Sequence, residues 1–220
     1  MAELIHGLDA DRVRANLAEV RAEIAAACAR SGRDAADVEV LAAVKYVPLD
    51  DVGVLADAGI TLAGENRAQD LVAKQGRWGE RLTFDFIGHL QSRKVRQVLP
   101  HVRLIHSVAS DSVLAQLERH APPETEVLVE VNVAGEEAKS GVHPGDLDAF
   151  LERCPCRVAG LMTMPPFAED PQGSRPWFAQ LRALAQERGL RELSMGTTQD
   201  FAVAVEEGAT IVRIGTRLYR

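Results

Sequence analysis

The sequence predicts an α/β protein in which eight parallel strands and their connecting helices close into one TIM-type (β/α)8 barrel over residues 1–220. Three observations support this prediction. Short apolar runs typical of strands recur eight times, a helical pattern follows every run except the last, and one further amphipathic pattern precedes the first run. Eight such units fit a closed barrel better than an open sheet, because barrels of roughly 200–250 residues commonly fold as one domain.

Residues 9–31 are predicted to form a long amphipathic helix. Val13, Leu17 and Val20 recur at helical spacing, so one face of the segment is apolar. Gly32 then ends the pattern. No helix is expected after the final strand, and this extra N-terminal helix is therefore expected to close the outer ring of the barrel in its place.

Strands and helices alternate along the rest of the chain. Runs rich in β-branched and apolar residues predict strands at 38–44, 60–64, 83–88, 104–108, 126–133, 158–162, 192–195 and 210–214. The segments between them predict helices at 49–58, 67–77, 91–98, 111–119, 145–153, 174–188 and 199–206. This alternation is typical of a parallel sheet.

Composition narrows the range of functions. Lys plus Arg number 25 and Asp plus Glu 32, and the formal net charge of −7 argues against a nucleic-acid or anionic-membrane partner. No apolar run approaches the ~18 residues of a membrane helix, and the first residues do not read as a secretory leader. Three cysteines, with Cys154 and Cys156 too close for the usual zinc pairing, predict neither a disulfide framework nor a metal site. We therefore expect a cytoplasmic protein, and a monomer, because no long apolar surface stripe is evident.

In a (β/α)8 barrel the active site lies where the strands end, so polar residues at those positions are the candidates. Lys45 follows the first strand run, and alternation places it on the same inward face as Leu41 and Ala43. A lysine above a small alanine at the mouth of a barrel is expected to be partly desolvated, which frees its amine to attack a carbonyl. The alternative is an ordinary exposed lysine at a strand terminus.

Two glycine-containing turns follow the last two strands. Gly196 precedes Thr197 and Thr198 at the start of a helix, where hydroxyl and backbone N–H groups bind an anion or cap the helix. Gly215, before Thr216, would let backbone N–H groups approach an oxyanion closely. Phosphate sites of barrels often lie at these turns, and two ordinary capped turns are the alternative.

Arg213 is predicted to point into the barrel, because its neighbours Val212 and Ile214 alternate to the other face. A charged residue there needs an acceptor, either from a ligand or from an internal carboxylate. Asn66 and His89, at two other strand ends, either contact a ligand ring or satisfy loop backbone groups. A lysine amine, a phosphate cradle and a polar group for a heteroaromatic nitrogen are together what pyridoxal phosphate requires.

Seven motifs cover nearly the whole chain in order. They are Ala43-Val44-Lys45, Gly64-Glu65-Asn66, Phe86-Ile87-Gly88-His89-Leu90-Gln91, Val131-Asn132 with Glu136 and Lys139-Ser140-Gly141, Gly160-Leu161-Met162, Leu193-Ser194-Met195-Gly196 with Asp200, and Val212-Arg213-Ile214-Gly215-Thr216. Together they resemble the pyridoxal phosphate homeostasis protein family, whose members are single-domain relatives of the alanine racemase barrel.

The resemblance implies the fold type III barrel of pyridoxal 5'-phosphate proteins, with the cofactor held as an aldimine on Lys45. It also implies that Arg213 faces the pyridine nitrogen and that Thr198, Gly215 and Thr216 hold the phosphate. The complete set of cofactor-binding residues that it implies is Lys45, Asn66, Met195, Thr197, Thr198, Arg213, Gly215 and Thr216.

The chain departs from the family pattern at several places. Asp85 stands where a histidine is common, Tyr46-Val47 replaces a pair such as Thr-Lys after Lys45, and Thr198 replaces a serine while keeping the hydroxyl.

Arg213 favours a carrier over an enzyme. An arginine stays charged and does not supply a proton to the ring nitrogen, so the cofactor is a weak electron sink. Related racemases compensate with a pair of bases, one of which comes from a further domain. The barrel is expected to take up this whole chain, so we expect no such domain here. The tyrosines of this chain are Tyr46 and Tyr219, and alternation turns Tyr46 away from Lys45.

We therefore expect a protein that binds pyridoxal 5'-phosphate and takes part in its intracellular homeostasis without robust turnover. Apoenzymes that depend on the cofactor are the partners to which such a carrier would deliver it. Two alternatives stay open at this point: a fold type III enzyme such as a weak amino-acid racemase, and a Schiff-base aldolase acting on a phosphorylated substrate.

Overall fold

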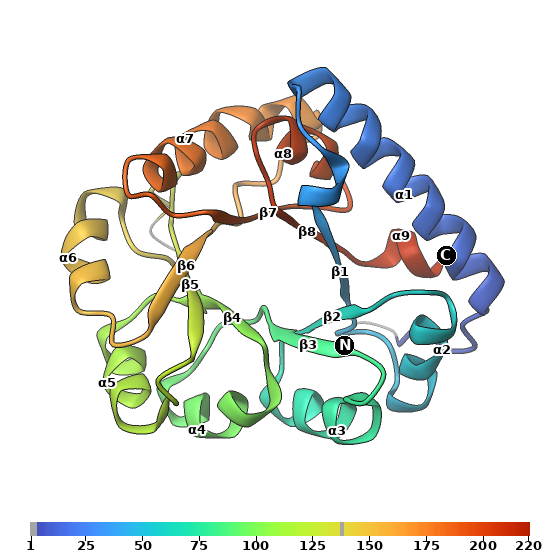
Figure 1. The fold of residues 1–220 in the computed structure, drawn as a ribbon, viewed down its shortest axis with the longest axis horizontal. Helices are drawn as coiled ribbons and strands as arrows, with labels where there is room; N and C mark the ends of the chain where they lie inside the picture. Colours follow the sequence, from blue (N-terminus) through green and yellow to red (C-terminus); the bar gives the residue numbers. More distant parts are fainter. Residues whose placement is uncertain (1–3, 137–138) are drawn as a thin grey trace.

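Eight parallel strands close into a barrel in which β1 is hydrogen-bonded to both β2 and β8 (Figure 1). The structure is a computed structural model that describes residues 4–136 and 139–220. The predicted (β/α)8 barrel is confirmed. Residues 1–3, where the segment that argued against a secretory leader begins, lie outside the described residues.

The strands follow one another around the barrel in chain order. They are β1 (Glu39–Ala43), β2 (Leu62–Glu65), β3 (Thr83–Phe86), β4 (Leu104–Val108), β5 (Glu126–Glu130), β6 (Arg157–Met162), β7 (Glu192–Thr197) and β8 (Ile211–Ile214). Each lies within about three residues of its predicted run.

The helices form the outer layer. They are α1 (Ala10–Ser31), α2 (Val52–Asp57), α3 (Ala68–Trp78), α4 (Val95–Val98), α5 (Asp111–His120), α6 (Leu147–Glu152), α7 (Arg175–Gln186), α8 (Phe201–Glu206) and α9 (Thr216–Tyr219). Short 3-10 turns occur at η1 (Ala35–Asp37), η2 (Leu49–Asp51), η3 (Ser92–Lys94), η4 (Leu99–His101), η5 (Pro144–Asp146) and η6 (Pro171–Ser174). The expectation that no helix follows the last strand is wrong, because α9 begins directly after Gly215.

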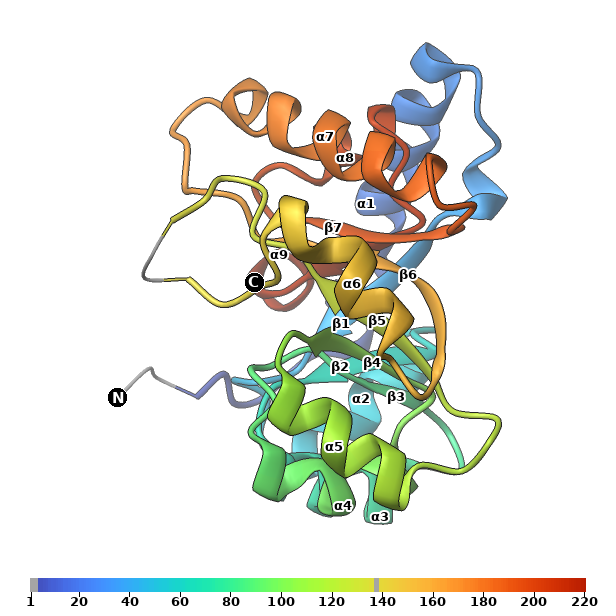
Figure 2. The same cartoon turned by 90° about the vertical axis from the view of Figure 1, so that its left-hand side faces the viewer.

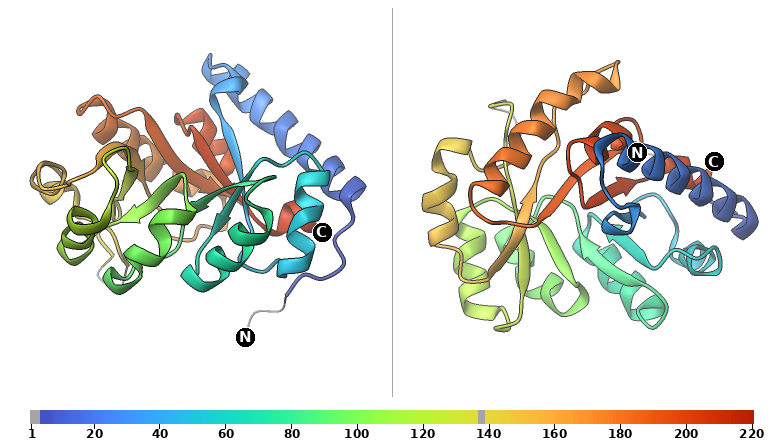
Figure 3. Two further views of the ribbon diagram at one scale, coloured as in Figure 1. Left: turned by 60° about the horizontal axis from the view of Figure 1, so that its bottom comes forward. Right: turned by 45° about the horizontal axis from the view of Figure 1, so that its top comes forward.

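Helix α1 begins and ends where its sequence signals predict. The Asp9 carboxylate accepts from the backbone N–H of Arg12 at 2.8 Å, and Gly32 closes the helix in the left-handed region at φ 68°. The helix lies along the outside of the barrel beside α8 and α9 (Figure 3). Its apolar face therefore covers the strands nearest the chain ends, and α9 shares that task.

Alternation divides the strand side chains into two cores. The inward side chains form an apolar cluster within the barrel, consisting of Leu41, Leu62, Leu104, Leu128, Met162 and Ile211. Outward side chains such as Val212 and Ile214 pack under the helices. Burial of each large apolar side chain contributes roughly 1.5–3 kcal/mol. The rest of the barrel interior holds the polar side chains of Asp85, His106 and Arg213, which this apolar cluster surrounds.

The strands end on one side of the molecule, and the long connections after β5 and β6 lie there together with the C-terminal residue (left in Figure 2). Within the part of the chain that the structure describes, no helix combines the length and the apolar character needed to cross a membrane.

Gly160 in β6 is predicted to be essential for the packing of β6 against β7. A Cβ atom at this position would lie 1.8 Å from the backbone oxygen of Glu192, which cannot move without separating the strands. We expect Gly160→Ala to lower the free energy of unfolding by about 1–3 kcal/mol, measured by urea denaturation.

Gly76 in α3 gives a matched control, because nothing lies within 4 Å of a Cβ built there. Gly76→Ala should stabilise the protein by up to about 1 kcal/mol through helix propensity. Wild-type stability of the Gly160→Ala variant would contradict the argument.

Candidate functional site

A cavity of about 350 Å³ opens where the strands end, between the segments that follow β1, β2, β3, β6, β7 and β8. Seven of the eight predicted binding residues line it: Lys45, Asn66, Thr197, Thr198, Arg213, Gly215 and Thr216. The structure therefore brings these seven residues together from four separate segments of the chain. The eighth, Met195, is not among the residues that line the cavity.

Met195 lies outside the barrel because β7 alternates. Ser194 points inward to Arg213, so Met195 points outward, and its fully buried side chain belongs to the core under the helices. His89 likewise does not line the cavity and is exposed. Of the two ring-contact candidates, Asn66 and His89, only Asn66 lies at the cavity.

Lys45 lies on a turn that leaves β1 at the barrel mouth. Its side chain is exposed, so the expectation of partial desolvation above Ala43 is wrong. The reason is that β1 ends at Ala43 and the chain turns before Lys45. The same turn ends the alternation, and Tyr46 lines the cavity instead of pointing away, with its ring centroid 4.8 Å from Lys45 Nζ.

A buried ion pair fixes the turns that carry Lys45 and Asn66. Lys74 Nζ donates to Glu65 Oε2 at 2.6 Å and to the backbone oxygen of Val44 at 2.7 Å. Glu65 Oε1 accepts from the backbone N–H of Asn66 at 2.6 Å. Both charged side chains are buried, so the pair joins the ends of β1 and β2 in a low-dielectric setting.

Asn66 presents a buried oxygen that the described chain leaves unsatisfied. Its Oδ1 atom is buried and has no hydrogen-bond partner among the described residues. A buried acceptor in this state costs roughly 1–3 kcal/mol. A ligand carrying a hydroxyl or N–H group would remove that cost, so the atom fits a cavity that takes a polar ring.

Arg213 enters the floor of the cavity from inside the barrel, as alternation predicts. Its Nη1 donates to Ser194 O at 2.8 Å and to Ser194 Oγ at 2.5 Å, and its Nη2 donates to Thr163 O at 2.9 Å. Burial lowers the pKa of Arg213 to about 10, against the opposing charges of Asp200 and Glu130. Among the described residues no carboxylate forms an ion pair with it, so the alternative of an internal carboxylate partner is wrong.

The turns after β7 and β8 meet at the cavity rim. Gly196 adopts a φ of 88°, and a Cβ there would lie 2.5 Å from Ala204 Cβ, so the turn needs glycine. Thr198 Oγ1 accepts from the backbone N–H of Gly215 at 3.1 Å and joins the two turns. Helix α9 begins at Thr216, and N–H groups of a first helical turn lack partners within the helix. The rim is therefore rich in donors.

Two residues near the chain ends line the cavity without any signal in the sequence. Ile5 donates its backbone N–H to Tyr46 O at 2.8 Å, which lays the segment before α1 along the cavity. Tyr219 Oη donates to Ala43 O at 3.1 Å, and burial raises the pKa of the Tyr219 phenol. Neither residue follows a strand closely enough to be identified from the barrel geometry alone.

The charge of the lining defines the class of ligand. Among the residues that the structure describes, Lys45 and Arg213 are the lining residues with a formal charge, and no carboxylate lines the cavity. Two cations, hydroxyl groups and backbone donors suit a small anion with an aromatic ring and an electrophilic carbon. The residues present therefore fit pyridoxal phosphate.

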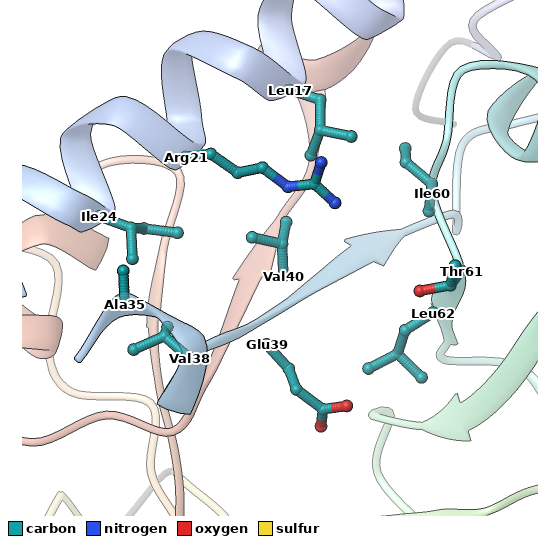
Figure 4. Close-up of a pocket in the computed structure, with 10 residues that line it drawn as sticks. All are labelled: Leu17, Arg21, Ile24, Ala35, Val38, Glu39, Val40, Ile60, Thr61 and Leu62. Carbon is teal, nitrogen blue, oxygen red and sulfur yellow. The ribbon is translucent and has the colours of Figure 1, made fainter.

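A second cavity of about 300 Å³ lies at the opposite end of the barrel, between α1 and the starts of β1 and β2. Its polar groups do not converge: Figure 4 shows the carboxylate of Glu39 pointing away from the guanidinium of Arg21. Features at this end of a (β/α)8 barrel usually serve stability. The first cavity is therefore the candidate site.

Comparisons with known proteins identify relatives that match most of the chain. No family model matches the chain. Curated proteins named "Pyridoxal phosphate homeostasis protein" are 40% identical in Aquifex aeolicus, over 92% of this chain and 95% of that protein, and 38% identical in Pseudomonas aeruginosa, over 93% of each. PipY of Synechococcus elongatus PCC7942, solved with PLP bound, superposes with a TM-score of 0.80 at 30% identity, covering 94% of this chain and all of PipY.

More distant structures share the fold alone. Alanine racemase from Corynebacterium glutamicum superposes with a TM-score of 0.72 at 16% identity, over all of this chain and 63% of the racemase. The barrel is thus common to proteins of different chemistry, and the cavity residues have to distinguish them.

The Lys74–Glu65 pair generates a prediction about stability. Lys74→Met leaves the Glu65 carboxylate buried without its cation, so we expect a loss of about 3–5 kcal/mol in urea denaturation. Adding Glu65→Gln to the same variant should recover part of the loss, because no charge is then left unpaired.

The exposed pair Arg81–Asp57 provides the control. Arg81→Met should cost less than about 1 kcal/mol. Equal losses for the Lys74 and Arg81 variants would show that the buried pair has no special structural role.

Proposed function

Because this chain belongs to the pyridoxal phosphate homeostasis protein family, we propose that it holds pyridoxal 5'-phosphate in the cavity at the strand ends and takes part in the homeostasis of that cofactor. The observation that carries the proposal is the meeting of one exposed lysine amine, one buried arginine and a donor-rich rim in a cavity that no carboxylate of residues 4–136 and 139–220 lines. When it is bound, the cofactor would act as an electron sink for a carbon atom of the group attached at its aldehyde position.

Lys45 is the proposed point of attachment. It is the lysine, of four in the chain, that lines the cavity. Lys74 is buried in its ion pair, Lys94 donates to Gln97, and Lys139 pairs with Glu136. Lys45 would hold the cofactor through its amine, whose condensation with the aldehyde would form a C=N bond and release water. Its exposure would allow water to return and free the cofactor.

The other lining residues are proposed to hold the ring and the phosphate. Arg213 faces the pyridine nitrogen from the cavity floor, and Asn66 Oδ1 accepts from a polar group on the ring. Thr198, Gly215 and Thr216 hold the phosphate at the rim. Thr197, whose N–H donates to Asp200 Oδ1 at 2.7 Å, lies beside them and fixes the shape of the turn.

We further propose a carrier without robust turnover. Arg213 is an obligate donor and leaves the ring nitrogen unprotonated, which weakens electron withdrawal. Tyr219 donates to Ala43 O and its raised pKa keeps it protonated, so it does not serve as a base. A fold type III enzyme such as a weak racemase is the second candidate, favoured by Tyr46, whose ring lies beside Lys45 in the cavity.

We also propose where the protein acts and how it passes on the cofactor. The three cysteines are free thiols, which supports a cytoplasmic location, where thiols stay reduced. The exposure of Lys45 supports transfer of the cofactor to apoenzymes, which we propose that the protein carries out as a monomer.

Absorption spectroscopy tests the attachment. The purified protein with pyridoxal phosphate should show a visible band that borohydride bleaches, with the pyridoxyl label on the peptide that contains Lys45. Lys45→Ala should bind at least about tenfold more weakly and take no label there. Lys94→Ala, a surface control, should behave as the wild type. A label that persists in Lys45→Ala, or a protein labelled only by a sugar phosphate, would overturn the proposal.

Deuterium exchange separates carrier from enzyme. The loaded protein is incubated with amino acids in heavy water, and incorporation at the α-carbon is followed by NMR. For a carrier, exchange should be no faster than with free pyridoxal phosphate at the same concentration. Faster exchange that Tyr46→Phe abolishes would establish the enzyme instead, with Tyr46 as its second base.

A further inference from the structure

A row of hydrogen bonds leads from the cavity floor into the barrel interior. Arg213 Nη1 donates to Ser194 Oγ at 2.5 Å, and Ser194 Oγ lies 2.9 Å from His106 Nδ1. His106 Nε2 lies 3.1 Å from Asp85 Oδ2. Asp85, His106 and Ser194 are each fully buried or nearly so, and they come from β3, β4 and β7. Four strands thus contribute to one polar row inside the barrel.

The row continues to the opposite end of the barrel. Arg103 donates to Asp85 through Nε at 3.1 Å and through Nη2 at 2.8 Å. Its Nη1 donates to Glu39 at 2.9 Å, and Glu39 lines the second cavity (Figure 4). The charge on Asp85 is therefore compensated at the end of the row that is remote from the candidate site.

The two arginines and a neutral His106 ring together determine the role of every atom between them. An arginine only donates, so Ser194 Oγ accepts from Arg213, and a neutral ring that donates to the Asp85 carboxylate leaves Nδ1 to accept from the Ser194 O–H. His106 Nδ1 is then an acceptor, its proton is on Nε2, and Nε2–H donates to the Asp85 carboxylate. Burial lowers the pKa of His106, in agreement with a neutral ring. Only one direction of hydrogen bonding satisfies the whole row.

Arg213 has a reason to need such support. The carboxylates of Asp200 and Glu130 are close enough to act on its charge. Three of its N–H groups are used by Ser194 and Thr163, which leaves Nε–H and one Nη2 N–H for a ligand in the cavity. Without the row, the guanidinium would keep its bonds to the backbone oxygens of Ser194 and Thr163 but lose the bond to Ser194 Oγ, and the attraction of the carboxylates would meet less opposition.

The geometry points to a positioning role for Ser194, His106 and Asp85: they hold Arg213 as a fixed donor, so that the cavity selects a ring whose nitrogen accepts a hydrogen bond. This inference rests on the proposed function and names the form of the ligand that the site takes. The selected ligand is an unprotonated pyridine, and a pyridinium or a carbon ring lacks the acceptor. His106 and Asp85 act through Arg213 and do not line the cavity.

The test compares two ligands that differ at the ring nitrogen. Pyridoxal phosphate and its deaza analogue, with C–H in place of the nitrogen, are titrated against the protein by absorption, and the ratio of their dissociation constants is measured. For the wild type we expect a preference of about tenfold or more for the nitrogen ring, the usual contribution of a hydrogen bond to a charged group.

The variants Ser194→Ala and His106→Leu should reduce this preference at least about threefold, and the double variant should reduce it no further, because one row carries the effect. His106→Asn keeps an acceptor near Nδ1 and should retain the preference. Leu104→Ala, two residues along the same inward face of β4, is the control that loses packing but should retain the preference.

The outcomes separate the two claims. A protein that binds neither ligand overturns the proposed function itself. Binding with an unchanged preference in folded Ser194→Ala overturns the positioning role, and this variant removes a single hydroxyl, so it tests the row even where His106→Leu fails to fold. A loss of preference in Leu104→Ala as large as in the row variants would also overturn it.

Discussion

The guanidinium of Arg213 is a cation inside a barrel of apolar side chains, and the need to satisfy it organises the interior. An uncompensated buried charge costs many kcal/mol, so a buried donor of this kind needs acceptors from the protein around it. Ser194 and Thr163 supply three oxygens, and His106 completes the coordination of the Ser194 hydroxyl. Because those acceptors come from different strands, the position of the cation depends on barrel closure itself. A charge placed in this way is held where a ligand can use it.

A second buried charge system serves the other side of the mouth. The Lys74–Glu65 pair holds the carbonyl before Lys45 and the amide of Asn66. The two systems meet different needs. The cavity floor requires a rigid donor, whereas the proposed role of Lys45 requires a side chain that can form and release a bond. The ion pair fixes the backbone at the base of the Lys45 turn, and the Lys45 side chain is exposed. Rigidity and access are thus separated within one cavity.

Much of the fold and part of the site followed from strand alternation. It placed Arg213 inward and brought the turns after the last two strands to one rim, because period-two patterning is a local property that barrel closure preserves. The resemblance implies that Met195 binds the cofactor, whereas alternation assigns this residue to the outer face, where its side chain is buried. Alternation fails for Tyr46, because this residue lies in a turn.

Other features could not be predicted, because they depend on distances between segments that sequence spacing does not encode. Lys74 lies on the amphipathic helix α3, and the sequence pattern of this helix predicts a solvent-exposed lysine. The packing of α3 on β2 buries it instead. Asp85 was visible as a departure from the family pattern, yet its partners Arg103 and His106 emerge only when β3 and β4 are placed side by side. Residues near the chain ends, such as Ile5, reach the cavity through a single backbone contact.

The barrel fold alone does not determine whether a bound cofactor takes part in catalysis or is only held. Racemase and decarboxylase structures share this fold at 12–17% identity, and the chain spans 62–64% of their length. What differs is the electronic setting of the ring and the supply of proton-transferring groups around it. In the proposed carrier, a donor at the ring nitrogen would lower the stability of carbanionic states, and a cavity that fixes this donor from behind would favour retention of the cofactor over its use.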